Sequence, residues 1–299
     1  MSHSEGDVPE GMLSGPFRGS RARRLGITGA QLAGPRFRRI HQDVYAPAST
    51  GDSLELRCHA AELVLPDDAV FCGATAARLY GLPVPRRDQD VHVAVPAKLP
   101  TAPRIKELRI HQYTIPPEQT GTYGGWRVVK PERLFLELAH ALDRFDLIAA
   151  GDQMLRRGHT TIDRLTGFLH GCDRRRGVKR ARDAVPLLDG RADSPPESRA
   201  RILLTDAGLP RPVVNQDVVN AWGIWLARPD LSYPELKIAI QYEGGHHQSD
   251  PAQYAYDIER DGRLIDEGWT VIRLDKNTLY NHPEIFVARI RRALARRSA

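Results

Sequence analysis

The chain has 299 residues, of which 41% are hydrophobic and 27% charged, with a formal net charge of +6 at pH 7. This composition is typical of a globular protein with two or three domains. No apolar run approaches the ~20 residues of a membrane-spanning helix, residues 1–17 lack the apolar core of a signal peptide, and three scattered cysteines exclude a disulfide framework. We therefore expect a cytoplasmic protein without membrane contact.

Arginine is concentrated in three stretches of the chain. Residues 17–42 contain seven arginines and no acidic residue, and residues 174–182 ("RRRGVKRAR") and 288–297 ("ARIRRALARR") form two further clusters. A solvated helix face explains any one of them. Because the guanidinium group matches phosphate oxygens, three clusters together favour an anionic partner such as DNA.

The first organised segment is residues 19–50, after a lead-in, residues 1–18, that we expect to be flexible. It begins with a short predicted helix and continues with a second one over 28–34, with Thr28 as N-cap and Gly34 at the end. The following residues alternate into a hairpin.

This order of two helices and a hairpin is typical of a small winged helix, whose second helix faces DNA. A structural cap on the next domain is the alternative. In the first interpretation, the residues predicted to contact nucleic acid are Thr28, Gln31, Arg36, Arg38 and Arg39.

Residues 51–188 alternate helices and short strands and are predicted to form a central mixed α/β domain. Strands are expected in "QDVHVAVP", "ELRIHQY" and "WRVVKP", which alternate with period two. We find no catalytic constellation there: Asp143, Asp146 and Asp152 are expected at helix caps and on the surface.

The stretch "LDGRADSPPES" is rich in Asp, Gly, Ser and Pro and predicts a linker. After it, the predicted order is α-β-β-β-α-β-α, which is a compact α/β domain over residues 189–299 with a central mixed sheet. The whole chain is therefore predicted to be a multidomain α/β protein.

Polar residues cluster at the end of the strand predicted from "ELKIAIQY". Residues of equal parity share one face of a strand, so Gln241 and Glu243 are neighbours there. If the preceding strand is an antiparallel neighbour, Asp230 approaches both. Glu197 could add a third carboxylate if its helix packs over the same face.

Converging carboxylates repel one another, and a divalent cation such as Mg²⁺ removes that repulsion. His247 follows the strand and could shuttle protons. On a basic protein, this set favours phosphodiester hydrolysis. Each residue also has an ordinary alternative: Asp230 as a turn cap, Glu197 in a first helical turn, His247 in a loop.

Four segments carry a family resemblance: "SPPESRARILLTDAGLPRP", "RPDLSYPELKIAIQYEGGHH", "QYAYDIERDGRLIDEGWTVIRL" and "HPEIFVARIRRAL". Together they resemble the very-short-patch-repair-endonuclease-like domain of the PD-(D/E)XK restriction-endonuclease-like superfamily. The resemblance implies that fold and Mg²⁺-dependent DNA hydrolysis, with Mn²⁺ as an alternative metal. It implies metal binding by Asp230, Gln241 and Glu243, and a catalytic site completed by Glu197 and His247. Relatives usually read Glu-x-Asp-Gly where this chain reads "QYEG", so the amide of Gln241 replaces a carboxylate.

The preceding region resembles AbiEi-type antitoxins of type IV toxin–antitoxin systems. "RLGITGAQLAGPRFRRIHQDVYAP" is similar to their winged helix, and "GATAARLYGLPVP" and "WRVVKPERLFLELA" to their central domain. This resemblance implies DNA binding and opposition to a nucleotidyltransferase toxin, although no residue here identifies such a partner. Two hypotheses follow: a DNA-tethered Mg²⁺-dependent endonuclease, or a non-enzymatic DNA-binding regulator or antitoxin with a degenerate nuclease site. A pure interaction protein is a third.

Overall fold

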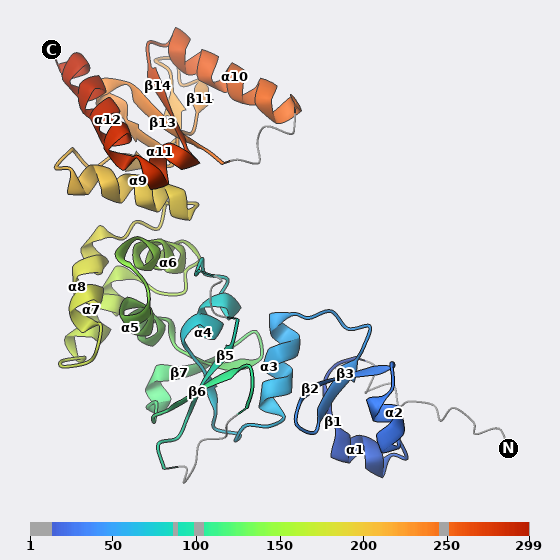
Figure 1. Ribbon diagram of the computed structural model, residues 1–299. Coiled ribbons are helices and arrows are strands. Elements are labelled where there is room, and N and C mark those ends of the chain that lie inside the picture. The colour runs from blue at the N-terminus through green and yellow to red at the C-terminus, as the bar shows by residue number, and fades with distance from the viewer. Residues whose placement is uncertain (1–13, 86–88, 99–104, 245–250, 299) are drawn as a thin grey trace. The chain divides into compact units, whose positions relative to one another are not determined.

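The computed structural model describes residues 14–298 except 86–88, 99–104 and 245–250, and for 251–258 it describes the backbone alone. The chain divides between Leu134 and Phe135 into two compact units, each a mixture of helices and strands (Figure 1). The predicted mixed α/β class is therefore confirmed. Within the described residues, no helix is both long and apolar enough to cross a membrane.

The first unit opens with two short helices on a three-stranded antiparallel sheet of order β1-β3-β2. Helix α2 has the predicted N-cap Thr28 and ends at Gly34. Phe17 and Phe37 meet edge to face in a small core with Leu32. The elements are β1 (Phe17–Arg18), α1 (Gly19–Arg24), α2 (Gly29–Ala33), β2 (Phe37–His41) and β3 (Val44–Pro47).

The rest of the first unit is a five-stranded mixed sheet of order β6-β5-β4-β8-β7. Its strands β5, β6 and β8 are the three predicted from alternation, whereas β4 and β7 were not predicted. The Tyr80 hydroxyl donates to the Val129 carbonyl at 3.1 Å and ties the segment after α4 to β8. The elements are α3 (Leu54–Glu62), β4 (Val70–Phe71), α4 (Gly73–Leu79), β5 (Val91–Val95), β6 (Leu108–Gln112), β7 (Thr120–Tyr123) and β8 (Trp126–Val129).

Helices dominate the start of the second unit. The Asp143 side chain caps α6 by accepting from the Asp146 N–H at 2.9 Å. Gly151 lies at a close approach, because a Cβ there would come within 2.6 Å of Leu188 and 2.9 Å of Phe135. The helices are α5 (Pro131–Ala141), which begins in the first unit, α6 (Arg144–Arg156), α7 (Ile162–His170) and α8 (Val178–Ala184).

The remainder of the second unit is built on a four-stranded mixed sheet of order β14-β13-β12-β9. The apolar core joins one face of this sheet to α9, α11 and α12, and the other face packs on α10 (Figure 1). The elements are α9 (Pro195–Asp206), β9 (Val213–Val214), β12 (Leu231–Tyr233), β13 (Ile238–Glu243), α10 (Pro251–Asp266), β14 (Thr270–Asp275), α11 (Lys276–Asn281) and α12 (Pro283–Ser298).

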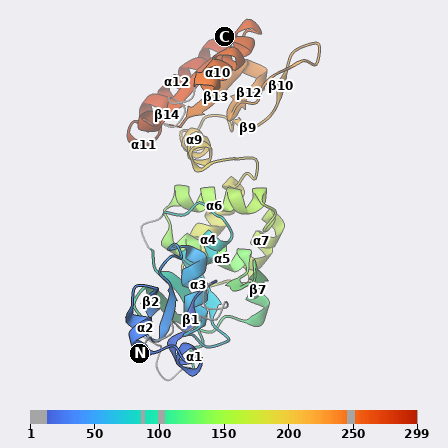
Figure 2. The same cartoon turned by 90° about the vertical axis from the view of Figure 1, so that its right-hand side faces the viewer.

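Two details of the predicted strands were wrong. The single strand expected over residues 224–231 ("IWLARPDL") is broken into β11 (Trp225–Ala227) and β12, and β11 pairs with β10 (Val218–Val219) in a separate hairpin (Figure 2). Strand β13 begins at Ile238, because Pro234–Leu236 forms a 3-10 turn and Lys237 adopts a positive φ of 51°.

Candidate functional site

The N-terminal arginines differ in whether their charge is compensated. Arg23 forms an ion pair with Asp43 at 2.7 Å. Five others are exposed and have no acidic side chain within ion-pair distance in the described part of the chain. We call these five the unpaired arginines: Arg18, Arg21, Arg24, Arg36 and Arg39. Uncompensated exposed guanidinium groups are available to phosphate.

Thr28 and Gln31 form two hydrogen bonds with each other. The Gln31 N–H donates to Thr28 Oγ1 at 3.2 Å, and the Thr28 N–H donates to Gln31 Oε1 at 2.8 Å. This capping box fixes the start of α2, and both residues remain exposed. Arg38 is half-buried and donates to the Thr50 carbonyl at 3.1 Å, so its role is partly structural.

Asp230 directly precedes β12, beside the end of β13 as predicted. The Tyr242 N–H donates to its Oδ2 at 2.6 Å, and its carbonyl accepts from the Asn215 N–H at 3.1 Å. Burial raises the pKa of Asp230 to about 7, and the charge of Glu197 adds to this, against the opposing effects of the Tyr242 N–H and of Arg260. The carboxyl is therefore close to half-protonated near neutral pH.

Glu197 lies close enough to Asp230 to influence its pKa, but its own oxygens are already engaged. They accept from the Ser194 hydroxyl at 2.6 Å, the Asp193 N–H at 2.8 Å and the Asn215 amide at 2.7 Å. Burial raises the pKa of Glu197, and these hydrogen bonds oppose that rise. Sequence reasoning missed Asn215, whose buried amide and positive φ of 46° have no local signature.

Gln241 and Glu243 lie on the same face of β13, as predicted, but their surroundings differ. Gln241 is 4% exposed, and its Nε2 has no hydrogen-bond partner in the described chain. Glu243 is exposed and pairs with Arg273 at 2.7 Å, and the same guanidinium donates to Asp261. His247 lies outside the described residues.

These side chains do not fit Mg²⁺ in this arrangement. In the described ranges, no group of three or more His, Cys, Asp or Glu side chains could hold a metal ion. Glu197 already accepts three hydrogen bonds and Glu243 is paired with a cation, so among the described residues Asp230 is the carboxylate of this set that keeps an oxygen without a hydrogen bond.

Replacing Gln241 with methionine is expected to leave the free energy of unfolding unchanged or to raise it by about 1 kcal/mol. The substitution keeps the volume and removes a buried amide nitrogen that has no partner. Gln241→Glu should lower stability, because it buries a charge at the same position. Urea denaturation at neutral pH measures both. If both variants lost the same free energy of unfolding, the Gln241 amide nitrogen would have to make a stabilising hydrogen bond after all.

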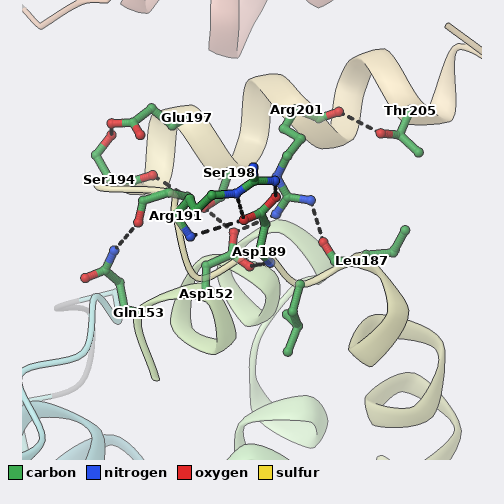
Figure 3. A network of polar contacts seen from close by, with 12 residues as sticks. Asp152, Gln153, Leu187, Asp189, Arg191, Ser194, Glu197, Ser198, Arg201 and Thr205 are labelled. Carbon is green, nitrogen blue, oxygen red and sulfur yellow. Dashed lines mark hydrogen bonds and ion pairs between the residues drawn. The ribbon is translucent and has the colours of Figure 1, made fainter. Parts of the chain in front are cut away.

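A buried polar network joins α6 to α9 and was not predicted (Figure 3). Asp152 and Arg201 form an ion pair at 2.6 Å with side chains 0% and 1% exposed. The Asp152 carboxylate also accepts from the Asp189 N–H at 2.6 Å and the Ser198 hydroxyl at 2.7 Å. Burial raises the pKa of Asp152, and Arg201 opposes that rise. The expectation that Asp152 lies on the surface was wrong, because helical periodicity does not identify a buried partner from a distant helix.

The sequence of residues 69–189 matches the family of the AbiEi antitoxin C-terminal domain. The matched region starts just before β4 and ends at Asp189, the residue whose N–H donates to Asp152. The chain therefore contains an antitoxin-like domain between its arginine-rich start and its C-terminal sheet.

Two relatives in Mycobacterium tuberculosis carry the titles "Uncharacterized protein Rv2248" (strain H37Rv) and "Uncharacterized protein MT2308" (strain CDC 1551). Each is 30% identical to this chain over 258 residues, which cover 86% of this chain and 92% of the relative. The chain belongs to the same family as these two mycobacterial proteins.

Proposed function

We propose that the protein is a DNA-binding regulator of the antitoxin type. The match of residues 69–189 to an antitoxin domain is the observation that carries this proposal. The unpaired arginines of the first unit support it, since exposed cations without acidic neighbours can neutralise DNA phosphates. The order of helices and hairpin around them is that of a winged helix.

In this proposal the unpaired arginines supply affinity, and α2 supplies the surface that faces the duplex. Phosphate contacts position a protein without reading sequence. The exposed side chains of Thr28 and Gln31 on α2 retain hydroxyl and amide groups for further contacts. The resemblance to antitoxins makes a nucleotidyltransferase toxin the proposed protein partner of residues 69–189.

Replacing Arg36 and Arg39 together with glutamine tests the DNA contact. We expect weaker binding to duplexes of every sequence and a log–log salt slope that is smaller by about 1.8, because each lost phosphate contact removes about 0.9. Fluorescence anisotropy at several salt concentrations measures the slope. Arg23→Gln is the control, since the charge of Arg23 is already paired with Asp43 and its loss should lower the slope by less than the about 0.9 expected for one phosphate contact. An unchanged slope in the double variant would refute the assignment.

DNA hydrolysis is a second candidate function, favoured by Asp230, just before β12, and Glu197, in the first turn of α9, which both accept hydrogen bonds from Asn215. Its test is incubation of the full chain with supercoiled, linear, mismatched and single-stranded DNA in the presence of Mg²⁺ or Mn²⁺. Cleavage that Asp230→Asn abolishes would support this candidate. If all DNA substrates stayed intact under every condition, DNA hydrolysis would be rejected and the DNA-binding regulator would remain the proposed function.

A further inference from the structure

The loop between α7 and α8 holds three consecutive arginines in a defined conformation. Its backbone is closed by hydrogen bonds from Cys172 to Leu169 at 3.1 Å, from Arg175 to Cys172 at 3.3 Å and from Val178 to Arg175 at 3.2 Å. Gly177 has a φ of 83°, and a Cβ there would lie 2.9 Å from the His140 backbone nitrogen. The loop therefore packs against the end of α5, and a larger residue at 177 would displace it.

The charges of this loop are not compensated. Arg174, Arg175 and Arg176 are exposed and have no acidic partner among the residues that the structure describes. The two acids nearest in sequence are already neutralised, because Asp173 pairs with Arg182 at 2.8 Å and Asp183 with Lys179 at 2.7 Å.

Several other arginines of the second unit are paired with carboxylates. Arg144 pairs with Asp206, Arg191 with Asp189 at 2.8 Å, and Arg273 with Glu243 and Asp261. The arginine loop, residues 174–176, is thus a place where three neighbouring cations face solvent together. Arg174 also adopts a positive φ of 64°, which is uncommon for a residue with a side chain.

We infer that the arginine loop is a second contact site for the phosphate backbone of nucleic acid, separate in sequence from the unpaired arginines. The inference rests on the proposed DNA-binding function. Duplex DNA carries one negative charge per about 1.7 Å of its axis, so three adjacent guanidinium groups meet several phosphates at once. The segment 173–177 contains no apolar side chain that could anchor a protein interface. An acidic protein segment is the competing ligand.

The test is duplex binding by the full chain with Arg174, Arg175 and Arg176 all replaced by glutamine. We expect the log–log salt slope to fall by up to about 2.7, equally for unrelated sequences. Replacing the same residues with lysine should largely preserve the slope. Arg127 on β8, Arg157 at the C-terminal end of α6 and Arg296 on α12 are exposed at scattered positions, and their triple replacement by glutamine is the control with the same loss of charge. Thermal melts confirm folding, and Arg175→Gln/Arg176→Gln is the second variant if the triple one is unstable, with an expected decrease of about 1.8.

An unchanged slope in the loop variant, or an equal decrease in the scattered control, would overturn the inference. Loss of binding to an acidic peptide with DNA binding intact would assign the loop to a protein instead, which also overturns it. The Arg36→Gln/Arg39→Gln variant separates the two proposals. If that variant lowers the slope and the loop variant does not, only the loop assignment fails. If neither lowers it, the DNA-binding function itself fails.

Discussion

Replacing Asp152 with alanine is expected to lower the free energy of unfolding of the second unit by about 3–5 kcal/mol, because it leaves a buried guanidinium without its counter-charge. Arg201 is 1% exposed, so water cannot take over the lost interaction without a rearrangement of α9. The Asp189 N–H and the Ser198 hydroxyl lose their acceptor in the same substitution. Chemical denaturation followed by far-UV circular dichroism measures the effect.

Two further variants test whether the loss of stability in Asp152→Ala comes from the unpaired buried charge. Arg144→Ala breaks the exposed pair with Asp206 and should cost at most about 1 kcal/mol. Asp152→Leu combined with Arg201→Met removes both charges, so it should recover much of the stability lost in Asp152→Ala. A denaturation midpoint of Asp152→Ala equal to that of Arg144→Ala would show that the network does not hold α6 and α9 together.

Replacing Asp230 with asparagine is expected to stabilise the protein above pH 7 by up to about 4 kcal/mol and to have little effect at pH 4. The folded-state pKa is about 7 against an ordinary value of 3.8, and each unit corresponds to about 1.36 kcal/mol. Between those two values the folded chain holds a proton that the unfolded chain has lost. The stability of the unsubstituted protein therefore falls as pH rises through this window and stays lower above it.

The asparagine oxygen can still accept from the Tyr242 N–H, so the substitution isolates the effect of charge. Urea titrations of both proteins at several pH values between 4 and 8 give the difference in stability as a function of pH. A constant difference would contradict the raised pKa. A variant less stable than the original at pH 8 would show that the ionised carboxylate has a stabilising partner in solution, such as a cation.

Elements with local signals were predictable from the sequence. Thr28 and Gly34 bracket α2 as expected, because capping depends on the few residues at each end of a helix. The parity of β13 was also correct, since Ile238 and Ile240 face the core shared with α12. The arginine clusters could also be located from the sequence, although the pairing of Arg23 and the partial burial of Arg38 could not.

Features that depend on distant residues were not predictable. The break between β11 and β12 reflects the pairing of β11 with β10, which no local pattern encodes. Glu197 accepts one of its hydrogen bonds from Asn215, which follows β9, and Glu243 pairs with Arg273 of β14. The order of acidic residues along the chain therefore predicted that Asp230 and Glu197 lie close together. It did not predict which of their oxygens are already hydrogen-bonded.

The network around Asp152 limits how this architecture can be divided. The antitoxin-like match ends at Asp189, and the sequence predicts a domain boundary at the same place. A fragment cut there would keep the carboxylate of Asp152 and lose Ser198 and Arg201, which supply two of its donors. Gln153 would lose its acceptor, the Ala192 carbonyl, as well. Helices α5–α8 are therefore expected to keep this structure only together with α9. Gene fusions that exchanged the C-terminal sheet would be expected to join the chain after Asp206 and not at the end of the antitoxin-like segment.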